Sequence, residues 1–417
     1  MNPRAAWPDF SLYRPHPPAA SLIDWVADAR AKTQAWLGDL EGAAVLGPRD
    51  VLLNPPQWEV GHLAWFWEKW LLRDGGVTPS GLLAHTDALY DSAAVAHATR
   101  WDIALIPWDA TWAYLDDVLA RVRKHLSDEP LTDELAYFTQ LCVFHHDMHN
   151  EAFAIRRQYL GDMPHDAAIS ALQRKPGTSM PANHDIAFAP GSRTHGARSG
   201  TGFVFDNEKW AHEIHHEAFA IAARVVTQTE FAAFVDAGGY ARREFWDVEG
   251  WRWREQSSAA HPLTWRHGSA GWACRFFDRW HALSPALPMM HVNAFEAQAW
   301  CAWAGRRLPT ETEWEAAYPR LADHGSVWEW TATPFAPYAG FSADPYAEYS
   351  APWFGGAYRV LRGGSVATSP RNIRRTWRNF YAPARSDMFC GFRTCAPTHP
   401  RPDIGAPLGA IRPVADA

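Results

Sequence analysis

The chain has 417 residues, of which 47% are hydrophobic and 20% charged, and its formal net charge is −7. This length predicts two or three domains with ample cores, and the absence of a basic domain or Lys/Arg run argues against a nucleic-acid partner. No apolar stretch reaches the roughly 18 residues of a membrane span, and the N-terminus lacks the apolar core of a secretory signal, so a cytoplasmic protein is expected.

The first 160 residues are predicted to form a four-helix bundle. Apolar residues recur at three- and four-residue spacing, and Asn54-Pro55-Pro56 is typical of a helix start with Pro in the first turn. The expected helices are 21–40, 58–72, 111–126 and 131–160. Four such segments with long connections are typical of a bundle, predicted over residues 1–162.

The rest of the chain has a different texture. Residues 163–200 are broken by Pro, Gly and Ser, which predicts a linker on the surface. Residues 201–397 combine dense turns and short strands with two helices, 230–237 and 294–304, each followed by Gly. Residues 398–417 are rich in Pro and Ala, which predicts a loose tail. The expected fold class is therefore α+β.

Two histidines four residues apart carry the sharpest signal. His145 and His149 share one face of a predicted helix, so both imidazoles can reach one metal ion. Glu151 lies about 200° round the helix from His149 and is expected to orient a ligand or a neighbouring helix instead. His146 lies about 100° off the shared face and is not expected to be a ligand. By itself, such a pair is as often structural as functional.

The third ligand should come from another helix, and His62 is the best candidate. Taken alone, His62 is more often read as a buried neutral histidine bonded to a backbone carbonyl. Beside the pair in the same bundle, it favours a three-histidine metal site. Three neutral imidazoles suit Fe(II), Zn or Cu, and the residues alone leave this choice open.

The cysteine and tryptophan content limits which other kinds of site the chain can form. The five cysteines are scattered and form no CxxC pair, so a zinc ribbon or disulfide framework is not expected. The 24 Trp residues indicate packed aromatic cores or an aromatic cage for a cationic ligand. Composition leaves both interpretations open.

Several motifs of the C-terminal half carry a family resemblance. They are Phe205-Asp206-Asn207-Glu208, Val292-Asn293-Ala294-Phe295-Glu296-Ala297, residues 303–315, Val327-Trp328-Glu329-Trp330-Thr331, Leu361-Arg362-Gly363-Gly364-Ser365 and Gly391-Phe392-Arg393. In order and spacing they resemble the formylglycine-generating-enzyme-type (sulfatase-modifying) domain, a C-type-lectin-like fold. The helix with His62, followed by HxxxHxE, resembles the DinB-like bundle. Residues 370–379 lack the cysteine pair of formylglycine-generating enzymes, so copper–thiolate chemistry is not expected.

The two domains in this order resemble the ergothioneine-type sulfoxide synthases. That family uses non-haem iron and dioxygen to join a sulfur donor to C2 of the imidazole of hercynine. The resemblance implies Fe(2+) as the cofactor, with His62, His145 and His149 as its ligands. It also implies that Tyr381 acts as a catalytic acid, the alternative being a packed core tyrosine with a bonded hydroxyl.

Three departures from that family point to the second substrate. Asp147 and Met148 replace a Gln pair between the histidines, and Arg100 stands alone where paired Arg often bind γ-glutamylcysteine. Residues 384–387 replace another Arg pair. These features resemble the selenoneine synthase (SenA) branch, whose donor is a selenosugar, and they make Arg100, Asp147 and Met148 candidate substrate-binding residues. The missing cations could also be supplied by Arg374, Arg375 or Arg378.

Hercynine itself suggests further contacts. Trp377, Phe380, Trp328 and Trp330 are candidates for an aromatic face on its trimethylammonium, although core packing is the favoured interpretation for Trp328 and Trp330. Arg378 and Asn379 are candidates for its carboxylate or amine, the alternative being a structural salt bridge.

The expected partners are hercynine, a selenosugar or thiol donor and dioxygen, with the oligomeric state left open. Two other functions stay open: a sulfoxide synthase that uses cysteine or γ-glutamylcysteine, and a non-catalytic ligand-binding module.

Overall fold

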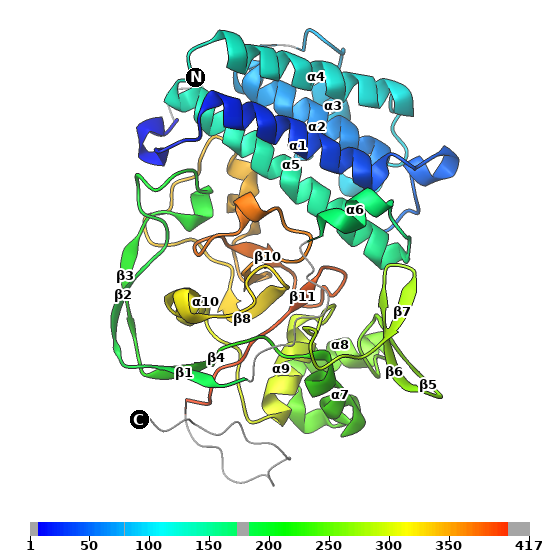
Figure 1. Ribbon diagram of the computed structural model, residues 1–417, viewed down its shortest axis with the longest axis vertical. Helices are drawn as coiled ribbons and strands as arrows, with labels where there is room; N and C mark the ends of the chain where they lie inside the picture. Colours follow the sequence, from blue (N-terminus) through cyan, green and yellow to red (C-terminus); the bar gives the residue numbers. More distant parts are fainter. Residues whose placement is uncertain (1–6, 79, 173–182, 399–417) are drawn as a thin grey trace.

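The structure is a computed structural model that describes residues 7–78, 80–172 and 183–398 (Figure 1). The N-terminal half is a layer of long helices, and the C-terminal half combines short strands with short helices below it (Figure 1). The predicted α+β class is confirmed.

Four long helices form the N-terminal bundle. They are α1 (Ala19–Leu37), α2 (Pro56–Leu71), α4 (Trp108–Asp128) and α5 (Asp133–Leu160). All four were predicted, with ends within four residues of those expected, because each carries an uninterrupted apolar periodicity. Helix α2 lies against α4 and α5, and α1 lies against α5 and α4. Two short helices, α3 (Thr86–Tyr90) and α6 (Asp166–Ala171), lie against α2 and α1 respectively.

Helix α5 is the longest element and has well-formed ends. The side chain of Thr132 accepts a hydrogen bond from the backbone N–H of Leu135, and Asp133 and Glu134 complement the helix dipole in the first turn. Gly161 ends the helix in the left-handed region, with φ of 74°. Burial on most sides of α2 and α5 places their side chains at the centre of the molecule.

The predicted linker over residues 163–200 is only partly correct. This interval contains α6, β1 (Asp185–Phe188) and β2 (Gly191–His195). Strand β1 pairs antiparallel with β4 (Phe219–Ala222), and β2 pairs antiparallel with β3 (His212–His216). The strands were missed because their partners lie more than 15 residues further along the chain. Residues 173–182 of the interval lie outside the described residues, as does nearly all of the predicted tail.

The C-terminal half is organised around a mixed sheet of order β10-β9-β8-β11. Its strands are β8 (Trp328–Pro334), β9 (Arg359–Arg362), β10 (Asn379–Tyr381) and β11 (Cys390–Gly391). A second sheet consists of β5 (Trp265–Gly268), β6 (Gly271–Phe276) and β7 (Arg279–Ala282). The helices are α7 (Gln228–Asp236), α8 (Val248–Ser257), α9 (Ala294–Trp303) and α10 (Glu311–Ala317). Helices α7 and α9 match the two predictions, whereas α8 and α10 were not predicted.

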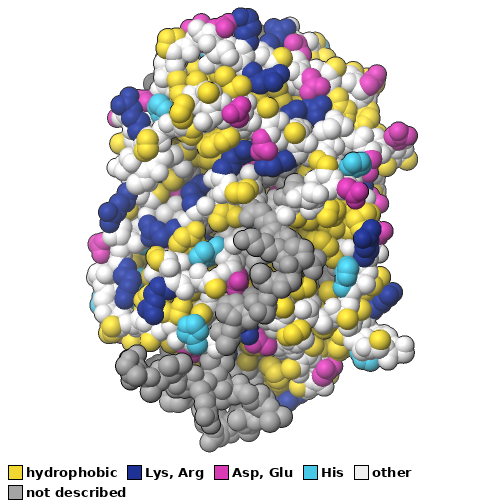
Figure 2. Space-filling view, in the orientation of Figure 1, with side chains coloured by type: hydrophobic (Ala, Val, Ile, Leu, Met, Phe, Trp, Pro, Cys, Tyr) yellow, Lys and Arg dark blue, Asp and Glu magenta, His cyan; other side chains and the backbone are white. Residues whose placement is uncertain are grey.

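One hydrophobic cluster runs through both halves, from Leu22 of α1 to Phe392 beside β11. The two halves therefore share a core. Four of the five cysteines are buried, and Cys274 is half-buried. Charged side chains of both signs are scattered among hydrophobic ones on the face seen in Figure 2. Within the described ranges, no helix combines the length and apolar character needed to cross a membrane.

Candidate metal centre and active site

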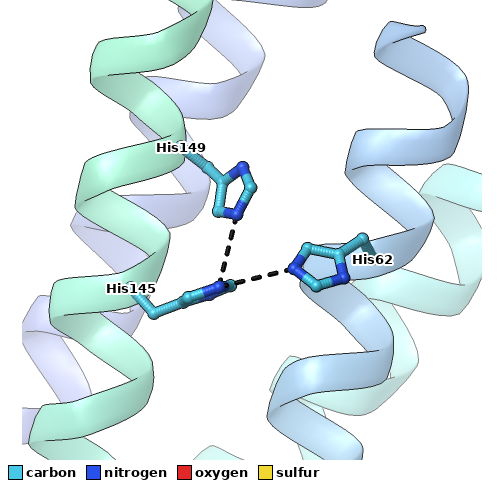
Figure 3. Close-up of side chains that lie close together, drawn as sticks. All are labelled: His62, His145 and His149. Carbon is cyan, nitrogen blue, oxygen red and sulfur yellow. Dashed lines mark hydrogen bonds between the residues drawn. The ribbon is translucent and has the colours of Figure 1, made fainter. Parts of the chain in front are cut away.

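Three histidines from two helices converge at the centre of the bundle (Figure 3). The Nε2 atom of His145 lies 3.4 Å from Nε2 of His62 and 3.3 Å from Nε2 of His149. Imidazole nitrogens bound to one ion at about 2.1 Å, with angles of about 90–110° between them, lie about 3.0–3.4 Å apart. Both distances from His145 fit ligands of a single metal ion, and all three ligand atoms lie within 4.8 Å of one another.

Hydrogen bonds to Nδ1 fix the orientation of the His62 and His149 rings, and with it the direction of their Nε2 atoms. Nδ1 of His62 donates to the carbonyl oxygen of Tyr90 at 2.7 Å, and Nδ1 of His149 donates to the Glu59 carboxylate at 2.5 Å. A ring that donates through Nδ1 keeps the lone pair on Nε2 for a metal. The carbonyl bond expected of a structural His62 is thus present, and it leaves Nε2 directed at the other two histidines.

Packing holds the third ring. The imidazole of His145 is stacked on Phe66 at 3.7 Å between ring centroids and 8° between planes. Its Nδ1 is buried without a hydrogen-bond partner in the described part of the chain. Burial lowers the pKa of His145 and His62 well below the ordinary value. Both rings are therefore neutral near pH 7, which is the form that binds a metal.

Gly61 permits this arrangement. A Cβ atom at Gly61 would lie 2.2 Å from Cε1 of the Tyr90 ring, which is closer than any real contact. Because only glycine leaves this space, the Tyr90 ring lies against α2 and its carbonyl reaches His62.

The neighbours of the ligands on α5 point elsewhere, as predicted. His146 lies 2.7 Å from the Thr33 hydroxyl and accepts a bond from the Trp67 indole at 3.0 Å. Glu151 faces the C-terminal half, where its carboxylate accepts bonds from Trp328 Nε1, Ser365 Oγ and Thr368 Oγ1 at 2.6–2.8 Å. Glu151 thus links α5 to the C-terminal half and is not part of the three-histidine group.

The substrate role predicted for Asp147 does not fit its contacts. Its buried carboxylate forms a two-point ion pair with Arg371 at 2.6 and 2.7 Å. Arg371 also lies 2.8 Å from Asp28 of α1. Asp147 is a second link between α5 and the C-terminal half, on the side of the helix away from the histidine pair.

Two tyrosines that the sequence analysis missed approach the ligand helix from the C-terminal half. The Tyr346 ring meets His145 edge-on, with centroids 5.9 Å apart. The Tyr349 hydroxyl donates to Sδ of Met148 at 3.8 Å and accepts from Trp377 Nε1 at 3.2 Å. Predicted residues Met148 and Trp377 are therefore brought together through Tyr349.

Buried polar contacts anchor both ends of the segment that carries these tyrosines. The Asp344 carboxylate accepts from the Tyr13 hydroxyl at 2.8 Å and pairs with Lys209, and Ser350 donates to Asp206. The segment holds only one short 3-10 helix, Ala347–Tyr349, so it carries no periodic signal. The sequence signal that could have pointed to this segment is Asp206 of the Phe205-Asp206-Asn207-Glu208 motif, because a buried carboxylate needs a hydrogen-bond partner elsewhere in the chain.

Arg378 is buried, whereas Phe380 is half-buried in an aromatic group of the C-terminal half. The Arg378 guanidinium bonds both oxygens of Glu311 at 2.8 and 3.0 Å and two backbone carbonyls at 2.9 and 3.0 Å. This is the structural alternative to substrate binding. Phe380 is stacked on Phe335 at 4.0 Å and 13°. Buried polar bonds thus account for Arg378, and ring contacts account for Phe380.

Asn379 and Tyr381 share the opposite face of β10 from Phe380. Arg385 lies over the Tyr381 ring at 5.2 Å, and burial raises the pKa of Tyr381 to about 12. The hydroxyl therefore keeps its proton at neutral pH. No ring contact or hydrogen bond joins Tyr381 to the three histidines in the described ranges, so its catalytic role stays a prediction.

Arg100 is buried within its own loop. Its guanidinium bonds the Asn54 side chain at 2.7 Å and the carbonyls of Ser92 and Val95 at 3.3 and 3.2 Å. These contacts leave little of the guanidinium for a substrate, contrary to the expectation from the sequence.

Comparison with known proteins matches both halves of the chain. The family described as sulfatase-modifying factor enzyme 1-like domain matches residues 171–320 and 321–397. Hercynine oxygenase of Mycobacterium tuberculosis is 32% identical over 426 residues, covering 88% of this chain and 96% of that protein. Hercynine oxygenase of Mycolicibacterium smegmatis is 31% identical, covering 89% and 98%. Ergothioneine biosynthesis protein 1 of Schizosaccharomyces pombe is 25% identical, covering 46% of this chain and 27% of that protein.

Proposed function

The chain belongs to the hercynine oxygenase family, and on that premise we propose that it is a non-haem iron oxidoreductase that uses dioxygen to modify hercynine. The observation that carries this proposal is the convergence of three imidazole Nε2 atoms from α2 and α5. Iron, as opposed to zinc or copper, is proposed from the family, because imidazole nitrogen suits all three metals. When bound, iron supplies dioxygen activation and brings the substrates together.

We infer that the second substrate is a neutral selenosugar, so that a carbon–selenium bond forms at C2 of the hercynine imidazole, as in selenoneine biosynthesis. A donor with carboxylates, such as γ-glutamylcysteine, needs cationic partners. Arg100 bonds the Asn54 side chain and two backbone carbonyls, and the arginines of residues 371–385 already have carboxylate partners. The pairs are Arg371 with Asp147, Arg374 with Glu208, Arg375 with Glu315, Arg378 with Glu311 and Arg385 with Asp387.

The second candidate is a sulfoxide synthase that joins cysteine or γ-glutamylcysteine to hercynine through a carbon–sulfur bond. The relative named ergothioneine biosynthesis protein 1 favours it. Mass spectrometry of the product separates the two candidates when anaerobically iron-loaded protein receives hercynine, dioxygen and competing selenosugar, cysteine and γ-glutamylcysteine. Preferential transfer of sulfur from either thiol would overturn the selenium proposal.

Metal content tests the site itself. His145→Ala should lose bound iron, whereas His146→Ala, a matched change one residue along the same helix, should retain it because His146 bonds Thr33 and Trp67 instead. Equal iron content in wild type and His145→Ala would favour a ligand-binding module without catalysis.

Two tyrosines are proposed to hold the proton for the oxidative steps. Tyr381 keeps its proton at neutral pH, and the Tyr349 hydroxyl reaches Met148, the residue before His149. Tyr381→Phe and Tyr349→Phe should each retain iron. Turnover should slow in the variant that lacks the proton-donating hydroxyl. Unchanged turnover in Tyr381→Phe would remove the role assigned to Tyr381.

A further inference from the structure

His62 lies in the middle of a stack of rings on α2. Trp58 lies one turn before it, with centroids 5.0 Å apart and planes 11° apart. Trp65 lies one turn after it, at 5.4 Å and 30°. Residues three and four apart share one helix face, so the spacing 58, 62, 65 produces this stack directly. All three side chains are buried.

Each of the two tryptophan rings also makes a cation–π contact. The Arg100 guanidinium carbon lies 3.8 Å from the centre of the Trp58 ring, and Nζ of Lys69 lies 4.6 Å from that of Trp65. Cations are attracted to the negative face of an aromatic ring, most strongly where water is excluded. The metal ligand His62 therefore stands between two cation-bearing rings.

The N–H groups of the three rings fix the orientation of the stack. The Trp58 indole donates to the Leu89 carbonyl at 2.8 Å, and the Trp65 indole donates to the Asp87 carboxylate at 2.6 Å. His62 donates to Tyr90 between them. Because all three acceptors belong to α3, this short helix sets the plane of each ring.

The two cations differ in how their charge is compensated. Lys69 lies 3.4 Å from the Asp91 carboxylate. Arg100 is only 8% exposed, its bonds go to the Asn54 amide and two carbonyls, and its Nε is without a partner in the described part of the chain. A buried charge without a bonded anion is costly to keep. Glu59 acts on the Arg100 charge only through space, and Arg100 acts on His62 more strongly than Lys69 does.

We propose that Arg100, acting through Trp58, is a positioning residue for the metal ligand His62 and raises the midpoint potential of the bound metal. The inference rests on the proposed function only in placing a redox-active metal on the three histidines. A nearby positive charge in a dry environment favours the lower oxidation state of a metal, and the stack holds the imidazole plane. This role replaces the substrate contact expected of Arg100 from the sequence.

Measuring the midpoint potential of the iron-loaded protein tests whether the charge of Arg100 acts on the metal. Arg100→Met should lower the midpoint potential. Arg100→Lys keeps the positive charge and should keep most of the wild-type potential. Arg30→Met is the matched control, because Arg30 lies 4.3 Å over Trp112, and Trp112 is not stacked on a metal ligand in the described structure. An unchanged potential in Arg100→Met, or an equal shift in Arg30→Met, would overturn the proposal.

Cobalt(II) binding tests the positioning, even if Arg100→Met fails to fold. Trp58→Leu removes the ring that contacts both Arg100 and His62 and should weaken Co(II) binding about 10–100-fold, with a changed visible spectrum. Unchanged affinity and spectrum would overturn the positioning role. Because neither readout needs turnover, the two proposals fail separately. Inactivity with hercynine despite these shifts counts against the proposed function alone, and normal turnover without them counts against this inference alone.

Discussion

Replacing Gly61 by alanine should weaken the metal site without touching a ligand. The new Cβ would lie 2.2 Å from Cε1 and 2.4 Å from Cζ of the Tyr90 ring, so the ring must move. Its backbone carbonyl is the acceptor for Nδ1 of His62 at 2.7 Å. Moving Tyr90 therefore frees the His62 ring to rotate, and the Nε2 atom leaves the position that the other two histidines share.

Two opposing terms set the size of the effect on stability. Overpacking of this kind costs about 1–3 kcal/mol, whereas alanine gains about 1 kcal/mol over glycine within a helix. The free energy of unfolding should thus fall by about 1 kcal/mol. Loss of an outer hydrogen bond to a ligating histidine weakens metal binding about 10–100-fold. The metal affinity should therefore change far more than the stability.

Competitive titration with Co(II), together with urea unfolding of the metal-free protein, measures both quantities. Gly81→Ala is the control, because an added Cβ at Gly81 meets nothing within 4 Å. Tyr90→Leu in the Gly61→Ala background removes most of the obstructing ring and should recover part of the affinity. Wild-type affinity in Gly61→Ala alone would refute the link between Gly61, Tyr90 and His62.

Three further changes test other contacts. Glu59→Gln replaces the carboxylate that accepts from Nδ1 of His149 and should weaken metal binding about 10-fold by competitive titration; equal affinity would show that the charge of Glu59 is not needed. Asp147→Ala leaves Arg371 with Asp28 alone and should lower the free energy of unfolding by about 3 kcal/mol in urea, and a loss under about 1 kcal/mol would contradict this. Burial raises the pKa of Asp206 from 3.8 to about 7, so the native state binds this proton more tightly than the unfolded state does. The free energy of unfolding should therefore fall by up to about 1 kcal/mol per pH unit between pH 4 and 7 on account of this group. Asp206→Asn should remove this contribution, and a variant with the same pH slope as wild type would argue against it.

The bundle and the convergence of the three histidines were predictable because their signals are local. Apolar periodicity placed all four long helices, and helical geometry moved the third ligand from Glu151 to another helix. Figure 3 shows this outcome, with His62 facing the pair across the bundle. Outer contacts were harder to predict, because the Tyr90 carbonyl and the Glu59 carboxylate depend on how α3 and α2 lie against α5.

The C-terminal half was less predictable because its contacts join distant residues. Arg378 was considered for substrate binding, yet its partner Glu311 lies 67 residues away and is identified only by the fold. Asp147 was likewise assigned from its position between the histidines, and its partner Arg371 lies 224 residues on. Tyr346 precedes and Tyr349 ends a single 3-10 turn (Ala347–Tyr349), which is too short for periodicity to mark a functional residue.

Helix α5 has consequences for building chimeras of related enzymes. One side of the helix carries His145 and His149, and the other side carries Asp147 and Glu151, which bind residues 365–371 of the C-terminal half. A crossover placed between residues 160 and 200 would separate these carboxylates from the hydroxyls and guanidinium that solvate them. A chimera should therefore fold only when α5 and residues 365–371 come from the same parent enzyme.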